Sequence, residues 1–391
     1  MNIAFFCIPA HGHTNPTLAV VRELTARGHT VRYYTTEAFR AKIEAAGAVF
    51  VPFDAEAARP GMTAADGARL GSDLAFSTRL IVDLTLAADD WLSRELTAHR
   101  PDVIVGDSMA FWAKLAAKKH GIPFVSSTTT FAFNRFSAKV IGQNGAGFLQ
   151  FLLAQPRINR QLKRLRAAGY AVKSVFDIIA NDNEAETVVY TSPDFQPCAD
   201  TFSEKYHFVG PLLRPAQSSF EKLPGRSLIY ISLGTVNNDA LPFYRACLAA
   251  FGGDPRFQLV LSAGTQTDLA AFGPIPESCI VRASVDQMAV LDCADVFLTH
   301  CGMNSASEGL WHGLPLVLYP QTPEQHGVAN RVAALGAGVP LTDPSADGIR
   351  RAVEAALTDP AYRENAQKLA GSFRRCGGAV EAADAIEHAA N

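Results

Sequence analysis

The chain has 391 residues and a formal net charge of −3, with 48% apolar and 19% charged residues. This composition is typical of a globular protein and excludes a disordered chain, and the near-neutral charge argues against nucleic-acid binding, which needs a basic surface. No apolar run approaches the ~18 residues that span a bilayer, so no integral membrane association is expected.

The first half of the chain alternates between predicted strands and helices. A helix is predicted to begin at Asn15-Pro16, where an N-cap residue precedes a proline. Further helices are predicted at about 37–46 and 111–121. Apolar runs of strand length lie at 3–9, 29–36, 48–53, 101–107, 122–128, 187–193 and 206–211. Strands that alternate with helices indicate a parallel sheet with right-handed crossovers.

A second cycle follows residues 214–226, which contain two prolines and little periodicity and are predicted to be a linker. A helix is predicted at 239–251, and the last ~45 residues are predicted to be helical. Strands are predicted at 227–234, 257–264, 279–285, 295–302 and 314–320.

The predicted fold class is therefore α/β, with two Rossmann-like doubly wound domains that face a central cleft. The N-terminal domain is expected to cover 1–213 and the C-terminal domain 227–391. The pattern leaves open whether the last helix packs back on the N-terminal domain. In doubly wound sheets, ligands bind at the carboxyl ends of the strands, so the chemistry is expected there.

The seven cysteines are scattered, without a Cys-x-x-Cys or zinc-finger spacing to histidine. They are interpreted as buried reduced thiols of a cytoplasmic protein. The apolar start of the chain lacks a basic region and a cleavage site, so it is interpreted as a first strand rather than a signal peptide.

Three common motifs are absent. Neither half has a G-x-G-x-x-G after its first strand, which argues against a dinucleotide oxidoreductase. The P-loop motif and the G-x-S-x-G nucleophile elbow are also missing, which argues against a P-loop ATPase and an α/β-hydrolase.

Two histidines follow the first strand, where a cleft residue is expected. An imidazole is the natural proton acceptor near neutral pH, and His13 lies nearer than His11 to the predicted helix start. Asp107 ends a strand of the same half, so its carboxylate could orient such an imidazole. The alternatives are a loop histidine bonded to backbone, and an N-cap role of Asp107 for a helix over 109–120.

The densest cluster of polar residues lies in 299–325. His300 ends a strand, Gly302 would let the backbone approach a ligand, and Asn304 and Ser305 open a helix whose free N–H groups suit a diphosphate. Ser305 and Glu308 also have capping-box spacing, which is a purely structural alternative. A carboxylate one turn into this helix could instead accept both hydroxyls of a ribose.

This stretch resembles the nucleotide-sugar signature of the UDP-glycosyltransferase superfamily, in particular the bacterial macrolide- and flavonoid-type enzymes of GT-B fold. The GHTNP segment near the N-terminus and SLGT at 232–235 match the same family. The resemblance is carried by the pattern H-x-G-x-N-S-x-x-E, G-x-P and P-x-x-x-E-Q, which comprises His300, Gly302, Asn304, Ser305, Glu308, Gly313, Pro315, Pro320, Glu324 and Gln325.

The resemblance implies a role for each matching residue. His13 would be the general base toward the acceptor hydroxyl, with Asp107 as its partner, and His11 only a neighbour. The diphosphate would be held by His300, Gly302, Asn304, Ser305 and Thr235, the ribose by Glu308, the sugar by Glu324 and Gln325, and Gln287 would lie beside the base.

One departure concerns the base. Many relatives have W-x-P-Q, with the tryptophan stacked on the base, where this chain has Ser284, Val285, Asp286 and Gln287. UDP is the expected donor nucleotide, and TDP stays possible.

The expected reaction is an inverting transfer of a sugar, with glucose the first candidate, from a UDP-sugar to a lipophilic small molecule such as a flavonoid or macrolide. No Asp-x-Asp is present, so no metal is expected to be essential and no cofactor is implied. Aromatic residues after strands of the first half are candidates for an acceptor pocket, with core packing as the alternative: Phe111, Trp112, Phe131, Phe133 and Phe136.

Two further classes stay open. A nucleotide-sugar epimerase can use the same fold but needs no apolar acceptor pocket. A non-catalytic partner of a glycosyltransferase should lack the base or the diphosphate-binding residues, and this chain keeps both His13 and His300.

Overall fold

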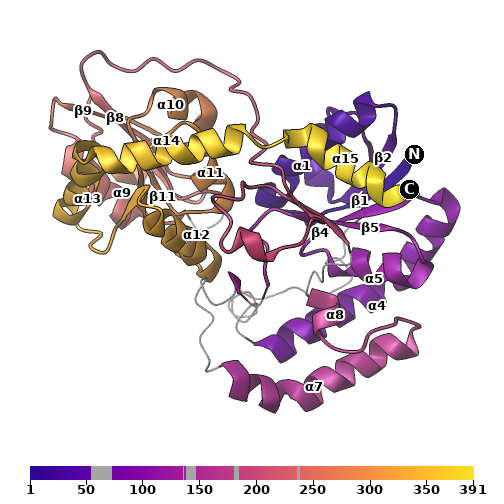
Figure 1. Ribbon diagram of the computed structural model, residues 1–391. Helices are drawn as coiled ribbons and strands as arrows, with labels where there is room; N and C mark the ends of the chain where they lie inside the picture. Colours follow the sequence, from indigo (N-terminus) through magenta and orange to yellow (C-terminus); the bar gives the residue numbers. More distant parts are fainter. Residues whose placement is uncertain (54–72, 135, 138–146, 180–184, 236–237) are drawn as a thin grey trace. The chain divides into compact units, whose positions relative to one another are not determined.

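The computed structural model describes residues 1–53, 73–134, 136–137, 147–179, 185–235 and 238–391, and the side chains of 147–153 are outside this description. The internal contacts divide the chain into two units. The first unit consists of Met1–Tyr190, Cys198–Leu212 and Gly377–Asn391, and the second of Thr191–Pro197 and Leu213–Cys376. Each unit is built around one parallel sheet (Figure 1), which confirms the predicted α/β class with two Rossmann-like units.

The sheet of the first unit has seven strands in the order β3-β2-β1-β4-β5-β6-β7. These strands are β1 (Asn2–Phe6), β2 (Thr30–Thr35), β3 (Val49–Pro52), β4 (Val103–Asp107), β5 (Phe124–Thr128), β6 (Glu186–Val189) and β7 (Tyr206–Phe208). The helices are α1 (His11–Ala26), α2 (Arg40–Glu44), α4 (Leu74–His99), α5 (Phe111–His120), α7 (Gly147–Ala167), α8 (Phe176–Ile179) and α15 (Gly378–Ala390).

Helices cover both faces of this sheet, which is why its strands are apolar throughout. Alternate residues of each strand point to opposite faces. On one face Phe5 packs in a core with residues of α1 and α15, including Leu24 and Ile386. On the other face Phe6 stacks on Tyr34, with ring centroids 4.3 Å apart, in a core shared with α4 and α5.

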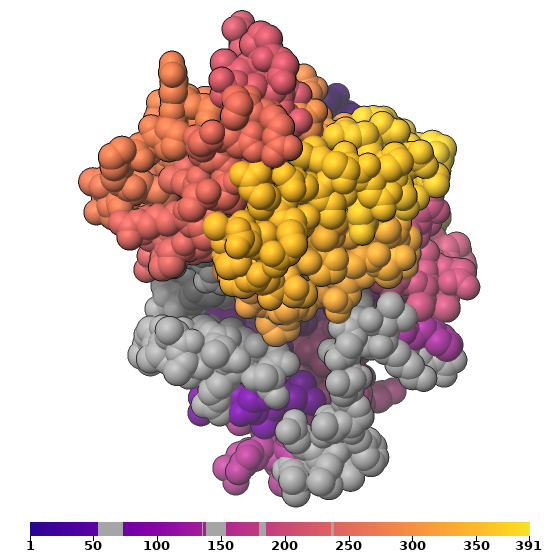
Figure 2. Space-filling view, turned by 90° about the vertical axis from the view of Figure 1, so that its left-hand side faces the viewer, coloured from indigo at the N-terminus to yellow at the C-terminus, as the bar shows by residue number. Residues whose placement is uncertain are grey.

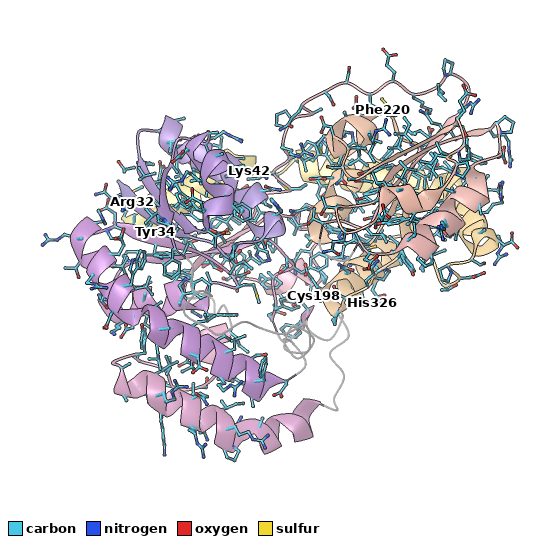
Figure 3. All side chains as sticks on the ribbon, turned by 180° about the vertical axis from the view of Figure 1, so that it is seen from behind. Arg32, Tyr34, Lys42, Cys198, Phe220 and His326 are labelled. Atoms are coloured by element: carbon cyan, nitrogen blue, oxygen red, sulfur yellow. The ribbon has the colours of Figure 1, made fainter. Side chains whose placement is uncertain are left out.

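A polar cluster joins β2 to α4 (Figure 3). Arg32 Nη2 donates to Glu95 Oε1 at 2.8 Å, and the Tyr34 hydroxyl donates to the same oxygen at 3.1 Å. Burial raises the pKa of Tyr34 well above its usual value, so its hydroxyl stays a proton donor. The cluster therefore satisfies the polar end of a tyrosine whose ring lies in the core.

The sheet of the second unit has six strands in the order β10-β9-β8-β11-β12-β13. They are β8 (Ser227–Ser232), β9 (Phe257–Ser262), β10 (Cys279–Arg282), β11 (Val296–Thr299), β12 (Leu316–Leu318) and β13 (Gly338–Pro340). The helices are α9 (Leu241–Phe251), α10 (Gln287–Cys293), α11 (Met303–Trp311), α12 (Pro323–Ala334), α13 (Ala346–Thr358) and α14 (Pro360–Arg374). Helices α9 and α13 pack together over one face, and their salmon and golden surfaces adjoin in the space-filling view (Figure 2).

The segment Thr191–Pro197 belongs to the second unit although it follows a strand of the first. The guanidinium of Arg331 donates to the carbonyls of Asp194 and Phe195, at 2.8 and 2.9 Å. The Phe195 ring is fully buried, edge to face with Phe373 at 5.7 Å. These contacts correct the expectation that 1–213 forms one continuous domain, because backbone carbonyls bonded to a partner far along the chain leave no local sequence pattern.

The last helix, α15, belongs to the first unit, the arrangement that the sequence left open. Gly378 N donates to the carbonyl of Val209 at 3.1 Å, and the buried side of the helix joins the core around α1. Arg27, the C-cap residue of α1, pairs with Asp384 at 2.6 Å and with Glu387 at 2.9 Å. Apolar burial and charge pairing therefore both hold the end of the chain in place.

Three elements differ from the sequence expectations. Helix α1 begins at His11, not at Asn15-Pro16, because the carbonyl of Ala10 already accepts from Thr14 N, at 2.9 Å. Pro16 is the sixth residue of this helix, where a proline removes a hydrogen bond without ending the helix. The 26-residue helix α4 was not expected, and neither was the short edge strand β13.

Within the described residues, no helix combines the length and apolar character that crossing a bilayer requires.

The core beneath α15 gives a stability prediction. Ile386 is 1% exposed, so Ile386→Ala should lower the free energy of unfolding of the first unit by about 2–4 kcal/mol through lost burial and a residual cavity. Urea titration, followed by a signal from the first unit, measures this change. The matched control is Val380→Ala on the same helix, because Val380 is 52% exposed and its loss should change the free energy by less than ~0.5 kcal/mol. Equal effects of both substitutions would contradict the packing described for α15.

Candidate active site

His13 and Asp107 meet at the point where the strand order of the first sheet reverses. The chain runs from β1 outward to β3 and then returns to β4 on the other side of β1. Phe6 pairs with Gly106, so the residues that follow β1 lie beside the end of β4. His13 Nδ1 lies 2.7 Å from Asp107 Oδ2. The predicted pair is therefore brought together, although His13 lies in the first turn of α1 rather than in a loop.

The hydrogen bond sets the protonation pattern of the imidazole. The Asp107 side chain is fully buried, and its other oxygen accepts from Met109 N at 2.9 Å. A carboxylate only accepts, so in the neutral imidazole Nδ1 of His13 carries the proton and Nε2 is the unprotonated nitrogen. The His13 side chain is 17% exposed, which leaves the ring partly open to a ligand. This arrangement suits a general base with an orienting acid.

The alternative that Asp107 acts as the N-cap of the following helix is only partly right. Its carboxylate bonds the backbone of Met109, but the N-cap of α5 is Ala110 and has no side-chain cap. Thr129 was missed by the sequence reasoning, and its Oγ1 lies 3.0 Å from His13 Nδ1. Its position in the sequence could have pointed to Thr129, because this residue directly follows β5, the strand that pairs with β4.

His11 lies in a different environment from His13. Its Nδ1 is 3.4 Å from Lys42 Nζ, and its ring contacts Phe39 edge to face. Lys42 is labelled in Figure 3. Burial, with a further effect of the Lys42 charge, lowers the pKa of His11. The prediction that His11 is a neighbour of the pair and not part of it agrees with these contacts.

The second sheet places His300 at its own strand-order reversal, where β8 pairs with β11 and Ser232 lies opposite Thr299. Two glycines make room for the imidazole. A Cβ added to Gly234 or to Gly302 would lie 2.6 Å from His300 Nε2. Gly234 also has φ +80°, a conformation that other residues rarely adopt. Gly302 therefore makes room for the His300 side chain, while the approach of a ligand that the sequence suggested stays a prediction.

His300 is neutral near pH 7. Burial lowers its pKa to about 4, and the Ser232 backbone offsets part of that effect. Its buried Nδ1 makes no hydrogen bond within the described residues. A neutral imidazole has a single N–H donor and no positive charge, so a contribution of His300 to anion binding would be a hydrogen bond rather than a charge contact.

The helix after His300 starts differently from the capping-box alternative. Its N-cap is Gly302, which has no side chain, and Ser305 is the third helical residue. Glu308 lies a turn deeper and accepts from Gln287 Nε2. The capping-box interpretation is thus wrong. The first turn of α11, which contains Asn304 and Ser305, directly follows the turn of His300, and its role as an anion site stays a prediction.

Glu308 and Gln287 form a short chain with a buried tyrosine. The hydroxyl of Tyr230 donates to Gln287 Oε1 at 3.0 Å, and Gln287 donates to Glu308. Burial raises the pKa of Glu308, and the bond from Gln287 and the nearby charge of Arg214 act against this rise. The carboxylate is therefore held in one orientation in a poorly solvated position.

Asp286, which the sequence marked as a departure, has a structural task. Its Oδ2 accepts from the backbone N–H groups of Gln217 and Ser218, at 2.6 and 2.9 Å, and Arg214 lies 3.5 Å from Oδ1. The predicted linker is thus bonded to the loop before α10. Ser284 in the same loop is exposed.

The remaining donor-side candidates lie at a helix start and a loop. Gln325 closes a capping box of α12, where its Oε1 accepts from Gln321 N at 2.8 Å and from Thr322 N. Only its amide nitrogen is left for a sugar hydroxyl. Glu324 is exposed in the first turn of the same helix, and Thr235 is exposed after β8.

The five aromatic candidates for the acceptor pocket divide into two groups. Trp112 and Phe131 are 5% and 3% exposed, and Phe111 packs against the core beneath α4 and α7, which favours the core-packing alternative for these three. Phe133 and Phe136 are 50% and 41% exposed. Met109 was missed, although it is exposed and follows Asp107 by two residues.

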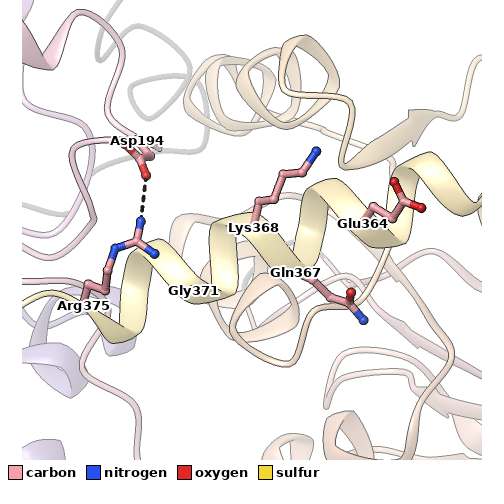
Figure 4. A pocket seen from close by; sticks show the side chains of 6 residues that line it. All are labelled: Asp194, Glu364, Gln367, Lys368, Gly371 and Arg375. Carbon is pink, nitrogen blue, oxygen red and sulfur yellow. Dashed lines mark hydrogen bonds and ion pairs between the residues drawn. The ribbon is translucent and has the colours of Figure 1, made fainter.

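A shallow depression of about 620 Å³ lies along α14 in the second unit (Figure 4). An ion pair between Arg375 and Asp194, at 3.4 Å, spans one end of it. No predicted site residue lines it: its walls are Asp194, Glu364, Gln367, Lys368, Gly371 and Arg375. Elsewhere in the described part of the chain, no group of three or more His, Cys, Asp and Glu side chains is placed to hold a metal ion.

Comparisons with known proteins agree on one family. Residues 257–377 match the erythromycin biosynthesis protein CIII-like C-terminal domain. The chain is 33% identical to an NDP-glycosyltransferase, YjiC, of Bacillus licheniformis, over 99% of this chain and 97% of that protein. It is also 33% identical to the demethyllactenocin mycarosyltransferase of Streptomyces fradiae, over 99% and 86% of the two chains.

A solved structure extends this likeness to the fold. The glycosyltransferase of kitacinnamycin superposes with a TM-score of 0.86 at 30% identity, over 99% of this chain and 98% of that one. With its two Rossmann-like units, the chain belongs to the bacterial NDP-glycosyltransferases of the macrolide type, which have the GT-B fold.

Proposed function

We propose that this glycosyltransferase moves glucose from UDP-glucose to a hydroxyl of a lipophilic small molecule, such as a flavonoid, another phenolic or a macrolide, with inversion at the anomeric carbon. The observation that carries the proposal is the 2.7 Å hydrogen bond between His13 and a fully buried Asp107. It leaves Nε2 unprotonated, which is the state that a base needs in order to activate a hydroxyl.

The acceptor half of the reaction follows from this pair. The acceptor oxygen forms a bond to the anomeric carbon while His13 Nε2 takes its proton. Asp107 stabilises the imidazolium that results, because its carboxylate faces Nδ1. Attack from the face opposite the nucleotide inverts the centre. The exposed side chains of Met109, Phe133 and Phe136 would contact an apolar acceptor.

The donor half uses the second unit. The bond between the anomeric carbon and the phosphate oxygen breaks, and UDP leaves with the electron pair. The N–H groups that open α11 and the neutral N–H of His300 would stabilise the negative charge on the diphosphate. This stabilisation needs no metal, so we propose that the reaction proceeds without one. Glu308 would bind the ribose, with Thr235 at the phosphates and Gln287 at the base, and Glu324 and Gln325 at the sugar.

Four further points belong to the same proposal. The kitacinnamycin and mycarose enzymes carry natural products in their names, which supports a natural-product acceptor here. The relatives reported above are transferases, so the epimerase alternative has no support. Ser284 offers no stacking surface for the base, so TDP-sugars are the second donors that we propose. All seven cysteines are free thiols, which fits a reducing cytoplasm.

The first test is mass spectrometry of a reaction with UDP-glucose, EDTA and a polyhydroxylated flavonoid. A product heavier than the flavonoid by one hexose is expected, and its formation in EDTA would support transfer without a metal. A parallel reaction with TDP-glucose compares the two nucleotides. An epimerised donor, or an intact donor with every acceptor of a phenolic and macrolide panel, would overturn the proposed reaction.

The second test separates the two histidines of α1. His13→Ala should lower kcat by roughly 10²- to 10⁴-fold, because the acceptor hydroxyl loses its base, and should leave the Kd of UDP unchanged. The matched control is His11→Ala, two residues earlier in the same turn and bonded to Lys42 rather than to Asp107. Equal kcat values for the two variants would remove His13 from the mechanism.

The third test concerns Glu308. Glu308→Ala should raise the Kd of UDP about tenfold or more, with little change in unfolding midpoint, because the carboxylate is no member of a capping box. Since burial raises the pKa of Glu308, acidification should weaken UDP binding at a higher pH than for an exposed carboxyl, and this step should vanish in Glu308→Gln. Calorimetry measures the Kd of UDP and its pH dependence. The control is Glu364→Ala, which removes an exposed carboxyl. A large loss of stability at unchanged affinity would point to a structural residue.

A further inference from the structure

Asn238 is a fully buried polar side chain to which neither the sequence motifs nor the mechanism assign a role. Its Nδ2 donates to the carbonyl of Gly234 at 3.0 Å, and its Oδ1 accepts from Gln266 N at 3.3 Å. Its backbone carbonyl also accepts from the hydroxyl of Thr267. One residue thus joins the loop after β8 to the loop after β9, at the carboxyl edge of the second sheet.

The space around Asn238 is as specific as its hydrogen bonds. A Cβ added to Gly264 would lie 2.0 Å from Asn238 Cγ, so any larger residue there would displace the side chain. Gly264 also has φ +78°, which favours glycine by itself. Glycine at 264 is therefore required twice, once for its backbone and once to admit Asn238.

Gly234 is itself in close contact with the imidazole of His300. The carbonyl that Asn238 holds belongs to a glycine with φ +80°, and His300 Nε2 fills the place where its Cβ would be. Gly302 closes the other side of the same imidazole. Close contacts therefore connect four residues in order: Gly264, Asn238, Gly234 and His300. A shift of the Gly234 peptide would leave the His300 imidazole without this contact.

We infer that Asn238 is a positioning residue for donor binding, because it holds the Gly234 peptide in the conformation that keeps His300 oriented. The inference rests on the proposed function, in which His300 and Thr235 bind the diphosphate. Asn238 touches no reacting atom in this role. It acts through the Gly234 carbonyl, and a hydrogen-bond donor at this place is what the role requires.

The test measures the Kd of UDP and of TDP by calorimetry. Asn238→Ala and Asn238→Asp should each weaken nucleotide binding by roughly tenfold, and the KM of the acceptor should stay within about twofold of the wild type. An aspartate side chain has about the same volume as asparagine but lacks its N–H donor. A carboxylate oxygen would therefore face the Gly234 carbonyl oxygen. A residue that only fills space would tolerate that change, so the aspartate variant separates positioning from packing.

A pair of glycine variants tests the same contact from the other side. Gly264→Ala should weaken nucleotide binding because its Cβ displaces Asn238. Gly273→Ala is the comparison, since Gly273 also has a positive φ, +72°, but no atom lies within 4 Å of an added Cβ, so the substitution strains the backbone without a clash. Gly264→Ala should therefore weaken binding less in the Asn238→Ala background than in the wild type, because the clashing atoms are gone and only the backbone strain at 264 is left.

The outcomes are distinguishable. Wild-type nucleotide affinity in folded Asn238→Ala and Asn238→Asp would overturn the inference, and so would equal behaviour of Gly264→Ala and Gly273→Ala. If the Asn238 variants do not fold, the glycine pair decides. A wild type that binds neither UDP nor TDP would instead overturn the proposed function on which the inference rests.

Discussion

In both units, the parallel pairing of two strands that are distant in the sequence decides where the chemistry lies. Pairing of β1 with β4 brings the first turn of α1 to the end of β4, and His13 then meets Asp107. Pairing of β8 with β11 brings the loop of Gly234 against His300. Because the carboxyl ends of parallel strands share one edge, each reversal of strand order gathers polar groups beside a helix N-terminus.

Burial then sets the charge of these groups. His300 is neutral because its ring lies between two glycines with little access to water, so it contributes a hydrogen-bond donor rather than a cation. The same physics raises the pKa of Glu308, which Gln287 and the charge of Arg214 keep from rising further. The proposed donor site therefore depends on oriented dipoles and N–H groups, which keep their strength where water is excluded.

Local signals predicted some of the site and failed at definite places. The H-x-G-x-N-S-x-x-E spacing marked the turn in which His300 precedes a helix, but Ser305 and Glu308 do not form a capping box, since Gly302 is the N-cap and has no side chain. Gln325 does belong to a capping box, which its motif alone did not reveal. From the sequence, Asp286 was noticeable only because many relatives have a proline at this position. Its hydrogen bonds to 217 and 218 left no local signal, because these residues lie almost seventy positions away.

The sequence by itself determined the α/β class, the two cycles of strands and helices, and the turns that carry His13, Asp107 and His300, because apolar periodicity and turn residues act over a few positions. Only the tertiary structure decided that Asp107 Oδ2 faces His13 Nδ1 and that Asn238 donates a hydrogen bond to the Gly234 carbonyl. It also decided that 191–197 and the last helix belong to opposite units. Such contacts depend on the direction and register of distant strands and on the volume left by glycines, and neither is encoded in any short stretch of the chain.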